Sequence, residues 1–221
     1  MSNFSIPFQN DKQRVELASQ ILNNMLRLLE NDVTECLRYS YIYPYTKTSA
    51  PTNAYSPAVM YCFSLIELLG SFYVGTSRGT RLPKGKRTSH RAKKYMIDLM
   101  NYSQDDAEKL QKIYRHKLAH LAIPKPVIRY GDKNIKWKLH DPDPAHHLTT
   151  EQSPGTIPIG YLSHLDYDEI YVVNIMQLQR DITASVLSPD KGYLAALQKS
   201  QDLLKRFENA INEFYDPIVT D

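Results

Sequence analysis

The sequence predicts an all-α fold, a helical bundle with an inserted β-hairpin at about 126–140. On both sides of that segment apolar residues recur at three- and four-residue spacing, as they do on the buried face of a helix. The segment itself alternates apolar and basic residues around the turn sequence GDKN, which is typical of a hairpin. No internal repeat or change of composition divides the 221 residues. We therefore expect one domain over 1–221, with the hairpin and a proline-rich loop as an insertion at about 124–165.

The first half of the chain holds two long apolar stretches. A helix is expected over about 11–38, where Leu22, Leu29 and Val33 belong to a regular apolar stripe. A second helix is expected over 57–76, with Pro57 in the first turn. This helix is apolar on nearly all sides, so it should lie at the centre of the core.

Two shorter helices are expected before the hairpin, at about 88–101 and at about 103–122. Ser103 can cap the second of these, and acidic residues fill its first turn, where the helix dipole favours negative charge. The helix should stop before Pro124. Its last turns contain a cluster of cationic side chains.

The part of the chain after the hairpin is expected to begin with a proline-rich surface loop at 141–160. His146 and His147, within it, are expected to be solvated. Helices at about 166–187 and 190–215 should close the bundle.

Composition indicates an ordinary globular protein. The 27 basic and 24 acidic residues give a net charge of only +3, so any nucleic-acid interface must arise from local charge. Two cysteines, Cys36 and Cys62, are too few for a disulfide framework or a cysteine zinc site, which favours a reducing compartment. The sequence shows no signal peptide, and Glu67 interrupts its most apolar stretch. We therefore expect a cytoplasmic protein without a membrane span.

The sequence YRHKLAHLA, residues 114–122, carries the strongest candidate site. On an ideal helix His116 and His120 share one face, whereas Arg115 and His120 point about 140° apart. Three interpretations are open. The cluster is a helix end that favours cations, a histidine pair that binds a metal with a ligand from elsewhere, or an acid–base site with a phosphate-binding arginine. The third would suit cleavage of RNA by its own 2′-hydroxyl.

The segment RHKLAH resembles the R-x4-H motif of the HEPN family, with Arg115, His116 and His120 in the three motif positions. The surrounding helical pattern at about 11–122 and 166–215 is also similar. The resemblance implies an all-α fold that dimerises and brings the motifs of two chains into one cleft. It further implies metal-independent RNA cleavage that needs no cofactor and leaves a 2′,3′-cyclic phosphate. His120 would then be the general acid or base, Arg115 would stabilise phosphate charge, and His116 would position the substrate.

Such an activity would fit a toxin, phage-defence or RNA-processing role, and the sequence does not choose among these roles. A protein partner such as an antitoxin is therefore also expected. Other members keep the fold but bind RNA or a protein without catalysis, which is the alternative function for this chain.

A basic stretch at 78–94 has eight cations and no acidic residue. It is either an RNA-binding segment or a solvated connection. The candidate RNA-binding residues in it are Arg78, Arg81, Lys84, Lys86, Arg87, Arg91, Lys93 and Lys94. The hairpin raises the same two possibilities, because its cations alternate with Tyr130 and Trp137. Lysines that protect an edge strand from aggregation would give the same pattern.

Overall fold

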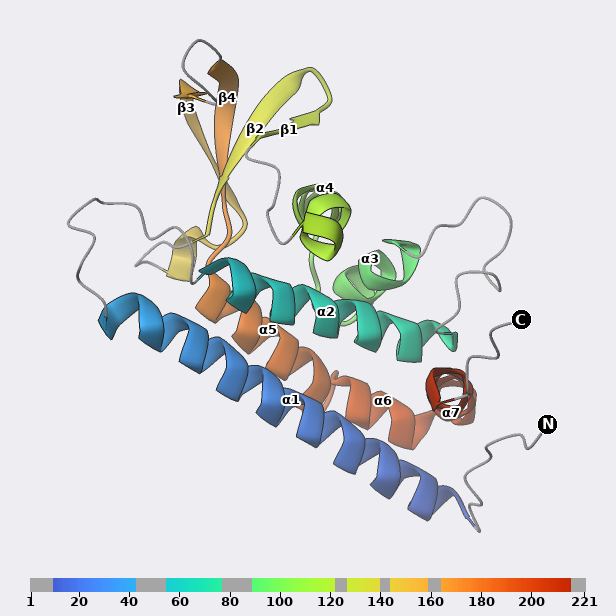
Figure 1. The fold of residues 1–221 in the computed structure, drawn as a ribbon. Coiled ribbons are helices and arrows are strands. Elements are labelled where there is room, and N and C mark those ends of the chain that lie inside the picture. Colours follow the sequence, from blue (N-terminus) through green and yellow to red (C-terminus); the bar gives the residue numbers. More distant parts are fainter. Residues whose placement is uncertain are drawn as a thin grey trace, which may run out of the picture. The chain divides into compact units, whose positions relative to one another are not determined.

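The computed structural model describes residues 10–42, 55–76, 89–121, 127–139, 144–158 and 164–215, and only the backbone at 38–42, 55–56, 89, 114–121, 144 and 215. In this part of the chain seven α-helices accompany a four-stranded mixed sheet (Figure 1). The fold is therefore α/β, and the prediction of an all-α HEPN-like bundle with a single inserted hairpin is wrong.

The elements follow one another with short connections wherever the structure describes the chain. The helices are α1 (Asp11–Ile42), α2 (Tyr55–Val74), α3 (Ser89–Asp98), α4 (Gln104–Leu121), α5 (Ile175–Leu187), α6 (Tyr193–Lys199) and α7 (Gln201–Tyr215). The strands are β1 (Val127–Tyr130), β2 (Lys133–Lys138), β3 (Thr149–Pro158) and β4 (His164–Val172), and a 3-10 turn, η2, covers Pro144–His146.

The elements expected before residue 140 are confirmed. The first four helices lie where the apolar spacing placed them, with ends displaced by a few residues. The expected hairpin is β1 and β2, in antiparallel register with Ile128 opposite Ile135. Gly131 occupies its turn with φ +63°, a left-handed conformation that costs glycine little.

The elements expected after residue 140 are partly wrong. The proline-rich loop at 141–160 contains β3, and the first part of the helix expected at 166–187 is β4. Proline is tolerated in β3 because this strand lies at the sheet edge and has a register shift between Gln152 and Gly155. The helix expected at 190–215 is divided at Ser200 into α6 and α7.

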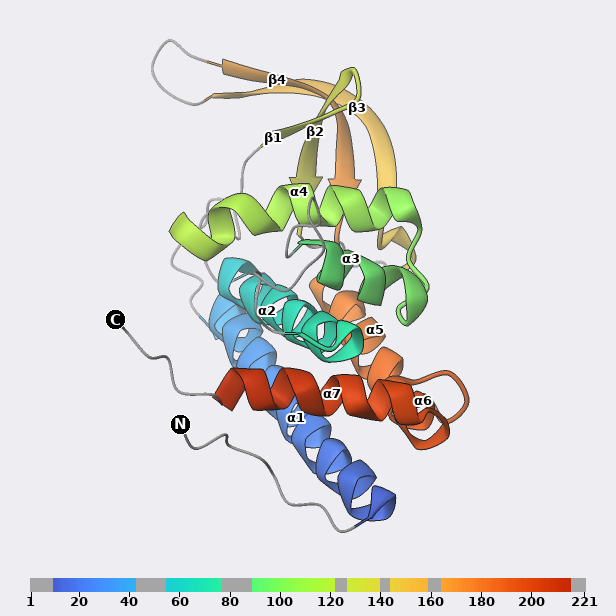
Figure 2. The ribbon, with the colours of Figure 1, turned by 90° about the vertical axis from the view of Figure 1, so that its right-hand side faces the viewer.

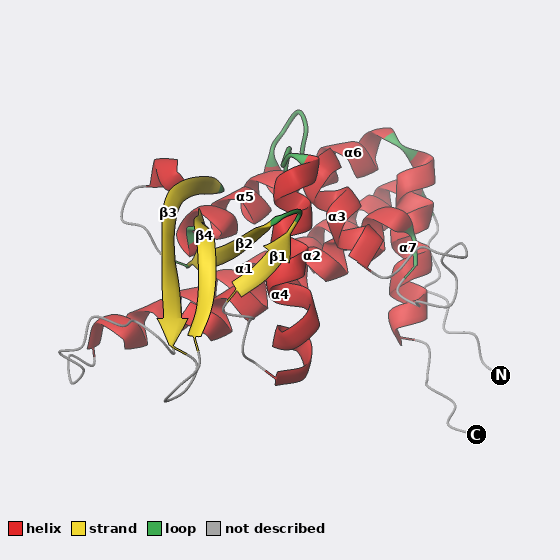
Figure 3. Cartoon of the chain, turned by 90° about the horizontal axis from the view of Figure 1, so that it is seen from above, coloured by secondary structure: helices red, strands yellow, loops and turns green. Residues whose placement is uncertain are grey.

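The sheet has the strand order β1-β2-β4-β3, so strands distant in sequence are neighbours. β2 and β4 are parallel, with Ile135 opposite Glu169 and Trp137 opposite Tyr171. β3 and β4 are antiparallel. In Figure 3, where strands are yellow and helices red, β1 is the strand beside α4.

By its internal contacts the chain divides into two compact units. The first comprises Met1–Leu28, Ser64–Tyr102 and Ile182–Asp221, and the second comprises Leu29–Phe63 and Ser103–Asp181. In its described part the first unit is helical, whereas the second holds the whole sheet and α4.

An aromatic cluster forms the core of the first unit. The rings of Tyr73, Tyr95 and Tyr193 meet edge to face, with centroids 5.9–6.1 Å apart. Phe207 from α7 extends the cluster to Tyr193 and to Phe72 of α2. Figure 2 shows α6 and α7, the helices that carry Tyr193 and Phe207, following one another in the red part of the chain. Such ring pairs add roughly 0.5–1.5 kcal/mol each beyond their burial.

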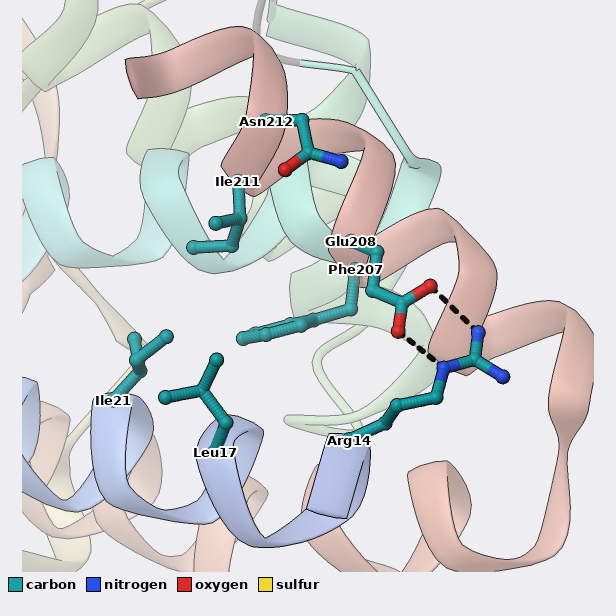
Figure 4. A pocket seen from close by; sticks show the side chains of 7 residues that line it. All are labelled: Arg14, Leu17, Ile21, Phe207, Glu208, Ile211 and Asn212. Atoms are coloured by element: carbon teal, nitrogen blue, oxygen red, sulfur yellow. Dashed lines mark hydrogen bonds and ion pairs between the residues drawn. The ribbon is translucent and has the colours of Figure 1, made fainter. Parts of the chain in front are cut away.

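An ion pair joins the start of α1 to α7 (Figure 4). The Arg14 guanidinium donates two hydrogen bonds to the Glu208 carboxylate, through Nε and through Nη2 at 2.6 Å. Both side chains are 20% exposed. The pair raises the pKa of Arg14, chiefly through the hydrogen bond that Arg14 donates to Glu208. Leu17, Ile21, Phe207 and Ile211 line a small hollow beside it.

One of the described helices could cross a membrane by length and hydropathy. This is α2, over Pro57–Val74, and half of that stretch is buried inside the protein. Such burial is consistent with the core helix of a soluble protein.

Candidate functional site

The R-x4-H motif lies in the last two turns of α4. Arg115, His116 and His120 follow one another within this helix, which ends at Leu121. Their side chains are outside the described part of the chain, so their geometry follows from the backbone alone. The helix starts as expected, since the Asp106 amide donates to Ser103 Oγ at 3.0 Å.

The described half of α4 is fixed to the sheet by polar contacts. Tyr171 of β4 donates from its hydroxyl to Asp106 Oδ1 at 2.8 Å. Lys109 lies between the helix and the sheet, only 9% exposed. Its Nζ is 2.8 Å from Asp105 Oδ2 and 5.2 Å from the centroid of the Tyr171 ring. A buried ammonium needs such partners, because desolvation would otherwise disfavour its charge.

Tyr130 of β1 completes this cluster. Lys109 and Lys112 lie 5.5 Å and 4.5 Å from the centroid of its ring. Hydrogen bonding to Asp105 raises the pKa of the Tyr130 hydroxyl, and burial adds to the effect. Hydrogen bonds from Lys109 and then from Tyr130 lower the pKa of Asp105. Tyr130, which the sequence offers as a ring for RNA bases, is thus engaged in attaching α4 to the sheet.

The backbone of α4 places the motif positions on two strips of the helix. Residues seven positions apart differ by only about 20° in direction. His116 follows Lys109 and His120 follows Ile113 at this spacing, on the strip that is buried farther up the helix. Arg115 follows half-buried Glu108 at this spacing, on a different side of the helix, next to exposed Lys112. One straight helix therefore separates the arginine from the second histidine, as the sequence predicts.

The basic stretch at 78–94 is described only in α3. Arg78, Arg81, Lys84, Lys86 and Arg87 lie outside the described residues.

The described cations of α3 make contacts within the protein. Arg91 is 8% exposed, and its Nη1 donates to the Thr76 carbonyl at 2.6 Å. Lys94 pairs with Asp98 at 2.6 Å and lies 5.6 Å from the centre of the Tyr73 ring. Lys93 is half-buried. Arg91 thus serves the interior of its unit, not a solvent-facing basic surface.

Two polar clusters in the sheet unit were missed from the sequence. Glu169, 5% exposed, accepts hydrogen bonds from Lys133 and Gln152 across neighbouring strands. The hydrogen bond from Lys133, and then that from Gln152, lowers the pKa of Glu169. The alternation of apolar and polar residues in β4 was the sequence pattern that could have predicted burial of Glu169.

His147 forms the second cluster, and its side chain is only 7% exposed, contrary to the expected solvated loop. Its Nδ1 accepts from the Asn174 amide at 3.0 Å, and its Nε2 lies 3.4 Å from Asp181 Oδ2. This ring fixes the turn before β3 to the start of α5. The described side chains, which do not include those of His116 and His120, contain no group of three or more that is suited to hold a metal ion.

No protein-family model matches the chain, and it matches no curated protein and no solved structure. The similarity to the R-x4-H motif therefore depends on the motif residues and their place in α4.

Proposed function

We propose that the protein is a metal-independent endoribonuclease that uses Arg115, His116 and His120 of α4. The observation that supports this function best is the motif's place, in the final two turns of one continuous helix whose first half is held against a sheet. What is carried over from the HEPN resemblance is the chemistry of the motif and not the family's fold.

The proposed reaction is a transesterification within the RNA chain. His120, as general base, takes the proton of a ribose 2′-hydroxyl while the oxygen attacks the adjacent phosphorus. The bond from phosphorus to the 5′-oxygen of the next nucleotide breaks, and that oxygen takes a proton from solvent water as it leaves. Arg115 neutralises charge on the phosphate oxygens, and His116 positions the substrate. The products are a 2′,3′-cyclic phosphate and a 5′-hydroxyl.

A homodimer can bring an arginine and a histidine of the motif together, which a single straight helix does not. Because Arg115 and His120 lie on different strips of α4, a complete site needs the arginine of one chain near the histidine of another. Such a protein would be cytoplasmic and could be restrained by an antitoxin. A toxin, defence or RNA-processing role would use the same chemistry.

The test is cleavage of a mixed RNA pool in the presence of EDTA. Wild type should produce fragments with cyclic-phosphate ends, and His120→Ala should lower the rate by at least about 100-fold. The exposed His164 offers a matched control, since His164→Ala removes a histidine outside the motif. Equal cleavage by wild type and His120→Ala would exclude the proposed site.

The second candidate function is a non-catalytic module that binds RNA or a protein. Exposed cations on the hairpin favour it, because they can attract a polyanion without any catalytic group. It predicts saturable, salt-dependent RNA binding with no cleavage by the wild type.

A further inference from the structure

The β1–β2 hairpin presents two chemically different faces. Ile128 and Ile135 are directly opposite each other and are 4% and 1% exposed, so their face is the buried one. Tyr130 lies on this same face, against the lysines of α4. Because side chains alternate along a strand, Arg129, Lys136 and Lys138 belong to the opposite face.

The register places these three cations next to one another. Arg129 is opposite Asn134 and Lys136 is opposite Val127, so Arg129 and Lys136 are diagonal neighbours, about 7–8 Å apart. Lys138 follows Lys136 on the same strand at about 7 Å. Arg129 and Lys138 are exposed and Lys136 is half-buried. The hairpin thus carries a row of positive charge on its outer face.

Lys133, the fourth cation of the hairpin, does not belong to this row. Lys133, on the inner face, is neutralised by the buried carboxylate of Glu169. The outer face of β1 and β2 carries no acidic residue in its sequence. Asp168 borders it from β4, where its Oδ2 accepts the Asn134 amide at 2.7 Å. Lys136 Nζ also lies 5.0 Å from the centre of the Tyr167 ring of β4.

We propose that Arg129, Lys136 and Lys138 bind the phosphates of single-stranded RNA along the outer face of the hairpin. A row of cations at strand spacing can follow a flexible polyanion. The choice of RNA as the polyanion rests on the proposed function of α4. The hairpin would hold the strand, and the motif would act on it.

The experiment measures binding apart from cleavage. A labelled single-stranded uridine 20-mer is titrated with the His120→Ala protein between 50 and 300 mM salt. The test variant adds Arg129→Gln, Lys136→Gln and Lys138→Gln. The control variant adds Lys191→Gln, Lys199→Gln and Lys205→Gln, which remove the same charge from exposed positions of the other unit.

With about 0.7 counterions released per phosphate contact, loss of three contacts should reduce the slope of log affinity against log salt by about 2. Affinity at low salt should fall at least about tenfold, and the control should bind as its parent does. Far-UV circular dichroism establishes that the test variant is folded, and a misfolded triple variant is replaced by the single changes, each expected to reduce the slope by about 0.7.

Two results would overturn the inference: an unchanged affinity and slope in the test variant, or no salt-dependent binding by the parent. Cleavage is measured separately in the wild-type background. RNA that is bound through the hairpin but never cut would contradict the nuclease and support the inference. RNA cleavage by the wild type, together with unchanged RNA binding by the test variant, would support the nuclease and contradict the inference about the hairpin.

Discussion

Two buried tyrosines in one aromatic cluster should respond in opposite ways to loss of the hydroxyl. Tyr95 and Tyr193 are both 0% exposed, and their ring centroids are 6.1 Å apart. The Tyr95 hydroxyl bonds to Ser185 Oγ at 2.9 Å, while Ser185 itself donates to the Ile182 carbonyl. Within the described part of the chain, the Tyr193 hydroxyl has no hydrogen-bond partner.

The magnitudes follow from this difference. Tyr95→Phe removes a buried hydrogen bond and leaves the Ser185 oxygen one donor short, which should lower the free energy of unfolding by about 1–2 kcal/mol. Tyr193→Phe removes a buried hydroxyl whose desolvation nothing offsets, so it should raise the free energy of unfolding by about 1 kcal/mol. The rings and their edge-to-face packing are retained in both variants.

Urea unfolding followed by far-UV circular dichroism measures both effects. With a slope of about 2 kcal/mol per molar urea, the midpoint should fall by about 0.5–1 M for Tyr95→Phe and rise by about 0.5 M for Tyr193→Phe. A similar loss of stability in both variants would refute the reasoning, because it would mean that the Tyr193 hydroxyl is satisfied in the folded protein.

The same pair predicts an alkaline limit to stability. Burial raises the pKa of both tyrosines in the folded state, so the folded protein keeps these protons when the unfolded chain releases them. Their contribution is complete below about pH 10, the ordinary tyrosine value, and is lost as pH rises above it. Above about pH 10, the free energy of unfolding should therefore fall more steeply with pH in the wild type than in Tyr193→Phe.

Two further predictions concern helix packing and the sheet. Gly70→Ala would place its Cβ 2.6 Å from the Arg91 backbone, so it should lower the free energy of unfolding, measured by thermal unfolding, by about 2–3 kcal/mol. Gly131 is the control, because it faces open space and has a left-handed φ that asparagine tolerates. Gly131→Asn should lower the free energy of unfolding by less than about 1 kcal/mol. The hydrogen bond from Lys133 holds the pKa of Glu169 below its ordinary value. The contribution of the Glu169 carboxylate to the free energy of unfolding is therefore present above about pH 4.3 and is lost as pH falls. Glu169→Gln should flatten the acid-unfolding curve, and an equally steep curve would contradict this pairing.

The helices before residue 122 could be predicted because their apolar spacing is local information. Leu22, Leu29 and Val33 repeat at helical spacing, and Ser103 caps α4 as its sequence indicates. The first hairpin was equally accessible, since Gly131 marks its turn. In each case neighbouring residues alone determine the element.

The second half of the sheet was missed because its strands depend on distant partners. β4 pairs in parallel with β2, a contact between residues more than thirty positions apart, and β3 then pairs with β4. Pro154 and Gly155 in β3 indicate a loop when considered locally and are tolerated only because the strand is an irregular edge. The buried role of Glu169 could not be foreseen either, since it requires Lys133 and Gln152 on adjacent strands.

The missed sheet changes how the motif on α4 must be understood. Tyr171 of β4 and Tyr130 of β1 bind the first half of this helix, and Lys109 is held between them. A continuous helix transmits its rotation from one turn to the next. The sheet therefore sets the direction in which the positions of Arg115 and His120 emerge two turns later. Any function of the motif, catalytic or binding, thus depends on strands that an all-α fold would not contain.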